Sequence, residues 1–353
     1  GYAYVWRRGV ADLTVDSYLR QQGHNKDFVA SPLYHMHENR ILRFRQNLEA
    51  TAEPKYAIYR MFRDEGGTDY FVRLFPFARA DGTEWEDGVI ISLLFVQPGG
   101  LTDDELVALE AILQVFALSA RSAATYAMAQ SVAHTYLGKD AGQRVLDGDI
   151  DRGSTSSMRA VIFFANLRGF TPLSEQVPGP AMLSMLDDYL NAIARGVLQR
   201  GGEVLKFFGD GALAVFEISD DDTECQIACQ KGMAAGQDAF AAISALNGVR
   251  EAQGQPTMAL DLALHIGDVL YGNVGAEGRL DFTVIDPAAN EASRIETLCG
   301  TLDRNWLAPE SFYLSARHCS DAMEPMGQHQ LHGLTGEWAL YSLPQNQQEA
   351  GWT

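Results

Sequence analysis

The sequence lacks three features, each of which would indicate a particular class of protein. Its 353 residues include only four cysteines and no Cys-x-x-Cys pair, so we expect buried free thiols rather than a metal or redox motif. It has no excess of basic residues: the net charge of -19 argues against nucleic acid or an anionic membrane surface as the main partner. Its longest apolar run, near residues 89–96, falls far short of the roughly 20 residues that cross a bilayer. We therefore expect a cytoplasmic protein without a membrane span.

The composition that is present is that of a globular protein with two domains. Hydrophobic residues make up 46% and charged residues 21%, and the chain is long enough for two domains that each bury a core. We expect a first domain at 1–101, a long helix at 102–136, a linker at 137–157, a second domain at 158–345 and a tail at 346–353. The linker is expected because its residues are polar and include several glycines.

Apolar runs separated by turns predict an antiparallel sheet in the first domain. The runs span 56–62, 70–77 and 88–96, with Gly-containing turns between them. A capping box of Thr102 and Glu105 then opens a stretch without Gly or Pro, which predicts a helix of about 35 residues. The apolar stripe of this helix fits equally a helix lying on its own sheet and a dimer seam; it consists of Leu106, Leu109, Leu113, Phe116 and Ala120.

Two short patterns in the first domain could bind ligands. His35 and His37 alternate as on one face of a strand, but no third ligand is evident, so we expect no metal there. Three arginines could clamp an anionic effector or form a solvated basic face, and we expect the latter; they are Arg40, Arg43 and Arg45. A sheet followed by one long exit helix resembles a GAF-like sensory domain, which implies an effector that is a small molecule or a protein.

The second domain carries four motifs in a fixed order. They read FFANLRGFT, VLKFFGDGALAVF, HIGDVLYGNVG and RLDFTVIDPAANEASR. The first is an apolar strand that ends at Asn166 and turns into a helix. The second is a hairpin that projects Asp210 from a rigid turn, with Lys206 as a charge inside an apolar strand, where burial without a partner is costly. The third, with three glycines, suits a tight bend and serves as scaffold.

The fourth motif is a strand followed by a helix. The helix presents Asn290 and Arg294 one turn apart on the same face, a spacing that lets an amide and a guanidinium converge on one polyphosphate. In this order, the four motifs resemble the catalytic signature of class III adenylate and guanylate cyclases, over residues 158–345. The resemblance implies an α+β fold in which a GAF-like antiparallel sheet with a long exit helix precedes a ferredoxin-like cyclase domain.

The resemblance also implies an activity and the residues that perform it. The domain would convert ATP to cyclic AMP and pyrophosphate with two Mg²⁺ or Mn²⁺ ions at the interface of a homodimer. The metal ligands would be Asp210, the residue at position 166 and the backbone carbonyl of Leu167. The phosphates would lie against the amides of Gly169, Phe170 and Thr171.

By the same resemblance, the remaining site residues recognise the nucleotide and stabilise its reaction. Lys206 and Thr283 would contact the adenine, Asn290 would orient the ribose, and Arg294 would stabilise the charge that develops on phosphorus. Lys206 favours ATP, because guanylyl cyclases carry an acid there. Lys206 and Asp210, on one hairpin, would serve opposite sites of the dimer.

Asn166 departs from the family, which has Asp at this position. An amide in place of a bridging carboxylate removes one negative charge, so we expect weaker metal binding and a rate lower by on the order of 10²–10³. Position 166 is then either an engineered change or a natural one. The alternatives to an adenylate cyclase are a catalytically silent nucleotide-binding regulator and a cyclase for GTP. A second departure is the turn at Asp286–Pro287, where the family has Gly first.

Overall fold

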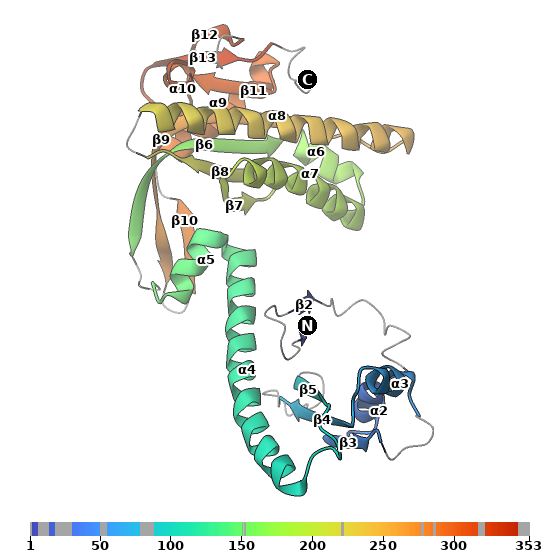
Figure 1. Ribbon diagram of the computed structural model, residues 1–353. Coiled ribbons are helices and arrows are strands. Elements are labelled where there is room, and N and C mark those ends of the chain that lie inside the picture. Colours follow the sequence, from blue (N-terminus) through green and yellow to red (C-terminus); the bar gives the residue numbers. More distant parts are fainter. Residues whose placement is uncertain are drawn as a thin grey trace. The chain divides into compact units, whose positions relative to one another are not determined.

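The computed structural model divides the chain into two compact units, residues 1–128 and 129–353 (Figure 1). It describes residues 30–49, 55–77, 88–149, 151, 153–219, 222–276, 279–284, 287–316 and 322–344, and the backbone of strands β1 (Tyr2–Val5) and β2 (Thr14–Ser17). Of residues 279 and 281–283 the backbone alone is described. The predicted tail at 346–353, Cys319 and Asp286 lie outside the described residues, as does the side chain of Thr283.

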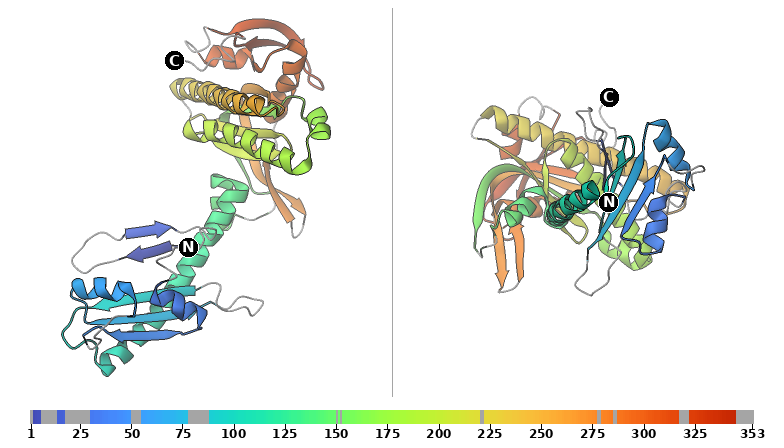
Figure 2. Two further views of the ribbon diagram at one scale, coloured as in Figure 1. Left: turned by 90° about the vertical axis from the view of Figure 1, so that its right-hand side faces the viewer. Right: turned by 60° about the horizontal axis from the view of Figure 1, so that its bottom comes forward.

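The first unit is an antiparallel sheet that helices cover on both faces (Figure 2). Its strands, in the order β3-β4-β5, are β3 (Arg43–Asn47), β4 (Asp69–Pro76) and β5 (Gly88–Phe95). Helices α2 (Pro32–Glu38) and α3 (Ala57–Asp64) pack on one face, where Tyr59 meets Val72. Helix α4 (Asp103–Leu137) packs on the other face, where Leu106 and Leu113 meet Phe71. An N-terminal sheet with a long helix is therefore confirmed, whereas its GAF-like character stays a prediction.

Two sequence-based assignments in this unit were wrong. Residues 56–62, predicted as a strand, belong mostly to helix α3, and the third strand of the sheet is β3. The burial of Tyr59 between the partly buried Tyr56 and Phe62 shows a period of three, which is that of a helix. His35 and His37 lie on helix α2 and not on a strand. Their nearest polar contacts are to Asn39 and Glu38, respectively.

Helix α4 confirms the predicted helix and its capping box. The Glu105 amide donates to Thr102 Oγ1 at 3.3 Å, and the Thr102 amide donates to Glu105 Oε2 at 2.8 Å. Of the ambiguous apolar stripe, Leu106 and Leu113 are buried on the sheet, while Phe116 is 57% exposed. Helix α4 is long and apolar enough to cross a membrane, so the expected absence of a span is not confirmed.

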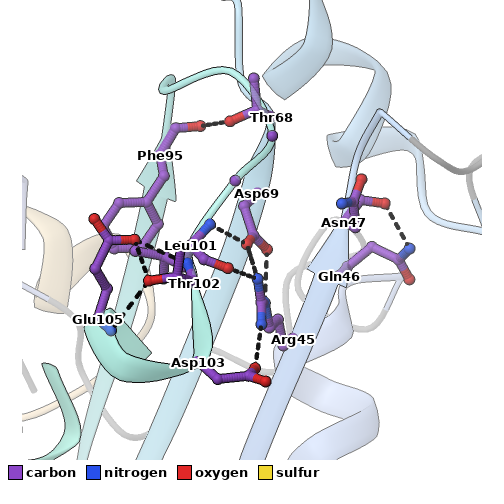
Figure 3. Close-up of polar contacts among 12 residues, drawn as sticks. Arg45, Gln46, Asn47, Thr68, Asp69, Phe95, Leu101, Thr102, Asp103 and Glu105 are labelled. Atoms are coloured by element: carbon purple, nitrogen blue, oxygen red, sulfur yellow. Dashed lines mark hydrogen bonds and ion pairs between the residues drawn. The ribbon is translucent and has the colours of Figure 1, made fainter. Parts of the chain in front are cut away.

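The start of α4 is fixed to the sheet by a buried ion pair (Figure 3). Asp69, fully buried in β4, accepts hydrogen bonds from Arg45 Nη2 at 2.7 Å, Arg45 Nε at 3.0 Å and the Leu101 amide at 3.0 Å. Arg45 Nη2 also donates to the Leu101 carbonyl at 2.5 Å. We call this set the Arg45–Asp69 clasp. Arg45 is therefore not part of the solvated basic face expected from the sequence, and Arg43 pairs with Glu110 at 2.8 Å.

The second unit is a mixed sheet whose strand order is β12-β13-β11-β9-β6-β8-β7, with β10 paired to β9. Its central strands are β6 (Thr155–Leu167), β7 (Glu203–Phe208), β8 (Gly211–Glu217) and β9 (Leu260–Ala276). Helix α7 (Gly179–Gln199) connects β6 to β7, and helix α8 (Asp222–Ala252) connects β8 to β9. This βαββαβ order, with antiparallel neighbours, is ferredoxin-like, as expected.

The remaining elements complete the two faces and the edge of this sheet. They are α5 (Lys139–Leu146), α6 (Phe170–Gln176), β10 (Arg279–Val284), α9 (Pro287–Leu302), β11 (Trp306–Pro309), α10 (Glu310–Ser315), β12 (Glu324–Gln330) and β13 (Glu337–Ser342). Helices α7 and α8 cover one face, where Val161, Phe163 and Leu167 form part of the core. Helix α9 covers the other face, where Ala292 packs against Ile162 (Figure 1).

The predicted linker at 137–157 is instead part of the second unit. It contains helix α5 and the first residues of β6, whose Thr155 pairs with Gly272. The Asp140 amide donates to Glu203 Oε1 at 2.9 Å, and Arg144 Nη2 donates to the Tyr271 hydroxyl at 2.6 Å. The polar composition of this segment reflects a helix with one exposed face rather than a flexible connection.

The glycines of the third motif serve packing rather than a tight bend, because β9 continues through all of them. A Cβ at Gly267 would collide with the Ala288 side chain, so this glycine lets α9 begin close to the strand. The neighbouring His265 is buried and lies 2.9 Å from Glu291 on α9. Burial lowers the pKa of His265, while Glu291 opposes the shift. The motif is therefore scaffold, as predicted.

Candidate functional site

Asn166 and Asp210 lie at adjacent ends of two central strands. Asn166 is the second-last residue of β6 and is paired in register with Gly211, the first residue of β8. Asp210 occupies the turn before Gly211, and Gly209 gives this turn its positive φ of 58°. The Asp210 carbonyl accepts a hydrogen bond from the Leu167 amide at 3.2 Å. The structure therefore brings together the three positions that the sequence assigned to metal binding.

The alternation of β6 decides which face Asn166 occupies. Phe163, Ala165 and Leu167 point into the core beneath α7 and α8, and the residues between them point to the face that α9 covers. Asn166 accordingly reaches α9, where its side chain hydrogen-bonds Glu296. It is half-buried, and its amide has a partner within the same chain.

Glu296 is a member of this site that the sequence reading missed. It is 7% exposed, and burial raises its pKa to about 7; Asp261 and Asp210 act in the same direction, while Asn166 and Arg168 oppose the shift. Desolvation also raises the pKa of Asp210. A signal was present in the sequence: Glu296 falls on the apolar stripe of α9, next to Ile295 and one turn before Cys299.

Arg168 anchors the loop that follows β6. Its Nε atom lies 2.9 Å and 3.0 Å from the two carboxylate oxygens of Asp261, and its Nη2 atom donates to the Arg304 carbonyl at 2.6 Å. Asp261 is 5% exposed; burial raises its pKa, and Arg168 opposes the shift. The Arg168 amide donates to the Ala259 carbonyl at 2.8 Å. These bonds fix the base of the loop that holds Gly169, Phe170 and Thr171.

Gly169 begins helix α6 from a left-handed conformation, with φ at 71°. A Cβ there would touch nothing within 4 Å, so the backbone conformation and not the space requires glycine. Phe170 is half-buried and Thr171 is exposed. The first amides of a helix have no partner within it, which makes this loop suited to accept anionic oxygens.

The residues that the sequence assigned to nucleotide recognition and catalysis lie on other surfaces. Asn290 and Arg294 are exposed on α9, whereas Glu296, two residues further on, lies on the buried face that meets Asn166. Lys206 is half-buried in β7, next to a bulge in the β7–β8 pairing. Within one chain, the structure thus brings Asn166, Leu167 and Asp210 together but places Asn290 and Arg294 on a different face of α9. The backbone of Thr283 pairs with Gly272 in β9.

The oxygen donors at this site suit a hard divalent cation shared with a substrate. Mg²⁺ takes oxygen ligands, and proteins hold it through one or two carboxylates together with substrate phosphates. Asp210 supplies one carboxylate, and Asn166 and Leu167 supply a neutral amide and a carbonyl. Within the described ranges, no group of three or more His, Cys, Asp or Glu could hold a metal ion without such help. The donor set therefore fits a cation that arrives with phosphate.

Comparison with known proteins assigns the second unit to a family. Residues 154–343 match the model of the adenylate and guanylate cyclase catalytic domain. An adenylate cyclase of Anabaena cylindrica is 34% identical over 180 residues, which cover 47% of this chain and 34% of that protein. Adenylate cyclase 1 of Rhizobium meliloti is 25% identical over 183 residues, which cover 51% of this chain and 26% of that protein.

Solved structures also match this chain. The adenylyl cyclase CyaB from P. aeruginosa is 26% identical, with a TM-score of 0.46, and the match covers 54% of this chain and 96% of that one. The matched region spans only about a third or less of the curated relatives' own length. Because the family model covers more than half of this chain, the chain belongs to the adenylate and guanylate cyclase catalytic-domain family.

Proposed function

We propose that the chain is an adenylate cyclase that converts ATP to cyclic AMP and pyrophosphate in a homodimer. The observation that carries the proposal is the distribution of the site residues over two faces. Asp210 and Asn166 lie at the adjacent ends of two central strands, and Asn290 and Arg294 are exposed on the side of α9 away from Glu296. A second copy would bring the exposed pair of one chain to the strand ends of the other. The adenylate cyclases among its relatives support this choice of reaction.

Each residue of the proposed site has its own role in this reaction. Lys206 contacts the adenine, Asn290 orients the ribose so that its 3′ oxygen faces the α phosphorus, and Arg294 stabilises the negative charge that develops there. The loop amides of Gly169, Phe170 and Thr171 hold the departing pyrophosphate. Asp210, with Asn166 and the Leu167 carbonyl, would hold Mg²⁺ or Mn²⁺, which when bound polarises the phosphate and lowers the pKa of the attacking hydroxyl.

The experiment that tests the proposal compares the chain with its Asn166→Asp variant. We expect cyclic AMP formation with Mn²⁺ in both, with a rate about 10²–10³ higher in the Asp variant, because a carboxylate restores the missing charge. Asp210→Asn, in the Asn166→Asp background, is the matched control and should abolish that gain. Silence of both proteins, with nucleotide binding retained, would instead establish a regulator that binds nucleotide without turning it over.

That silent regulator is the second candidate function, and one observation favours it. The Asn166 amide is engaged by Glu296, so position 166 has a structural role that needs no metal. Nucleotide binding measured by equilibrium dialysis, once with Mn²⁺ and once without metal, separates the two functions. A regulator of this kind binds ATP equally well with and without Mn²⁺, whereas an enzyme binds it more tightly with Mn²⁺.

Lys206 provides a separate test of the nucleotide. We expect Lys206→Glu to reduce the preference for ATP over GTP by at least tenfold in kcat/KM. A carboxylate accepts hydrogen bonds from the N–H donors of guanine, which the lysine ammonium, a donor itself, cannot accept. Lys206→Gln is the control for loss of charge alone. Rates with ATP and GTP would be measured in the Asn166→Asp background. An unchanged preference in Lys206→Glu would refute the role of Lys206 and reopen the GTP alternative.

A further inference from the structure

Glu291 lies on α9 between the two residues that the proposed function assigns to the ribose and the transition state. It follows Asn290 directly and precedes Arg294 by three residues, so its carboxylate is a neighbour of the Arg294 guanidinium on the helix surface. Glu291 Oε2 nevertheless lies 2.9 Å from His265 Nε2 on β9. We propose that His265 is a positioning residue, which holds Glu291 away from Arg294 and keeps Arg294 available to the substrate. This role of His265 rests on the proposed function of Arg294.

An acid that precedes an arginine by three or four residues on a helix ordinarily pairs with it. Helix α5 shows this ordinary case, because Arg144 Nε lies 2.8 Å from the carboxylate of Asp140, four residues earlier. On α9 the ion pairs among the described residues join Glu291 to His265, and none joins it to Arg294. Arg294 is exposed, so its side chain can turn toward an acceptor on its own helix. The position of the carboxylate, and not that of the guanidinium, therefore separates the two groups.

His265 retains the carboxylate because their bond is largely protected from water. The His265 side chain is 5% exposed and that of Glu291 23%, and the Trp338 ring lies edge-on to the imidazole at 5.9 Å. His265 Nδ1 is buried and has no partner in the part of the chain that the structure describes, so a ring that carries its proton on Nε2 donates to Glu291. A hydrogen bond to a carboxylate is roughly twice as strong as a neutral one, whereas an exposed ion pair contributes little. The bond to His265 therefore prevails over a surface pair with Arg294.

The backbone brings these two side chains together. His265 and Gly267 lie on one face of β9, and Ala288 and Glu291 lie about one turn apart on α9. A Cβ on Gly267 would collide with the Ala288 side chain, so the helix approaches the strand this closely only because residue 267 is glycine. The close approach lets Glu291 reach His265. The glycine and the histidine of the third motif therefore both determine where the first turns of α9 direct their side chains.

A structural anchor for α9 is the competing interpretation of this bond. Three apolar side chains already hold the helix on the sheet, since Ala288, Ala292 and Ile295 are each at most 5% exposed. Apolar burial of this kind stabilises a packed helix without a polar bond. An anchor and a restraint on Glu291 differ in one respect. Only the restraint becomes unnecessary when Glu291 loses its charge.

The kinetic test compares variants of both residues in the Asn166→Asp background, with ATP and Mn²⁺. We expect His265→Leu, which removes the donor, to lower kcat about tenfold and leave KM within about threefold, because Arg294 acts in the transition state. An exposed pair would hold Arg294 only weakly, but a dimer interface excludes water and strengthens the pair. His265→Gln, which keeps a donor, should retain most of the rate. Glu291→Gln should leave kcat within about threefold and, combined with His265→Leu, restore it, because a neutral amide does not neutralise the guanidinium.

The exposed Thr297 offers a variant that leaves the core untouched. Thr297→Glu places an acid three residues after Arg294, on the exposed side of α9, and should lower kcat about as much as His265→Leu does. Thr297→Gln is the matched control and should leave kcat unchanged. An unchanged kcat in Thr297→Glu would show that an acid at this spacing does not compete for Arg294, and would overturn the proposal even where His265→Leu fails to fold.

The position of the Glu291 carboxylate provides a readout that needs no catalysis. In a crystal structure of His265→Leu it should lie within about 4 Å of the Arg294 guanidinium, the distance of an ion pair, and in His265→Gln it should stay with residue 265. A carboxylate that stays away from Arg294 in His265→Leu would contradict the proposal. Equal losses of kcat in His265→Leu and Glu291→Gln, without recovery in the double variant, would establish the anchor instead. Inactivity of the Asn166→Asp background would contradict the proposed function alone, because the crystal structure still decides whether His265 restrains Glu291.

Discussion

Glu296 and Asn166 illustrate how a single replaced atom changes the chemistry of a site. With Asn at position 166, the amide donates to the Glu296 carboxylate, and this bond opposes the rise in the pKa of Glu296. With Asp at that position, two carboxylates would meet beside Asp210 and Asp261, and only a cation or a proton would separate them. The identity of residue 166 therefore determines how much positive charge, from cations or protons, is needed to balance the carboxylates of the site.

At this scale we expect the stability of the protein to depend on the protonation of Glu296. Its pKa is raised from 4.5 to about 7, so the folded state binds the proton more tightly than the unfolded state, and this stabilisation is lost as pH rises from about 4.5 to about 7. Glu296→Gln has no group that titrates here and does not show this loss, so its stability relative to wild type should rise by about 3 kcal/mol from pH 4 to pH 8. Urea unfolding at both pH values measures the difference.

The exposed Glu310→Gln serves as the control and should show no pH-dependent gain. A gain of equal size at pH 4 and pH 8 in Glu296→Gln would mean that packing and not ionisation is responsible.

The motif spacing was enough to place Asn166, Asp210 and the Gly169 turn, because each sits at the end of a strongly apolar strand. It did not reveal Glu296, because the motif spacing does not show that α9 turns this carboxylate inward to Asn166 while Arg294, two residues earlier, stays exposed.

At the scale of elements, local patterns predicted α4 but not α3. The capping box of Thr102 and Glu105 and a long stretch without Gly or Pro leave little choice of structure for α4. The run from 56 to 62 is short and apolar on several sides, so alternation and helical periodicity cannot be distinguished until Tyr59 and Phe62 are seen in one core. Longer segments with explicit caps are predictable; short apolar segments depend on what they pack against.

The Arg45–Asp69 clasp leads to a prediction at this scale. Asp69→Asn removes the buried carboxylate partner of Arg45 and leaves it only the exposed Asp103, at 4.0 Å, so the first unit should lose about 3 kcal/mol of stability. Amide hydrogen exchange in the first turn of α4 should accelerate, because the Leu101 amide loses a charged acceptor. Arg43→Gln, which breaks the more exposed pair with Glu110, is the control and should cost less than about 1 kcal/mol. Equal losses in the two variants would contradict this assignment.

At the scale of the whole molecule, composition located two domains but misplaced their border. Gly142, Gly148 and Gly153 indicated a linker, yet Ala141 and Gly142 are buried in α5, where a Cβ on Gly142 would come within 2.8 Å of the backbone of Ala133. Glycine serves close packing as well as flexibility, and sequence composition does not separate the two uses. The cyclase unit therefore begins before β6 and not within it.

The position of this border can be measured with two fragments. A fragment of residues 138–353 should melt about 5–10 °C higher than one of residues 158–353, which lacks α5 and the start of β6 and so loses about 2–3 kcal/mol. Differential scanning calorimetry compares them. In the longer fragment, Arg144→Gln should lower the melting temperature by part of this difference, because it removes the bond to Tyr271. Identical melting temperatures for the two fragments would restore the border at residue 158.

Strand β6 has a mechanical consequence for the unit that contains it. Its 13 residues span about 40 Å, and each one is paired with β9 from Thr155 to Leu167. Such a strand is rigid along its length, because it cannot slip by one residue without turning its whole inner row of side chains outward. A displacement applied where α5 meets the sheet would therefore be transmitted almost fully to Asn166, near the other end of the strand.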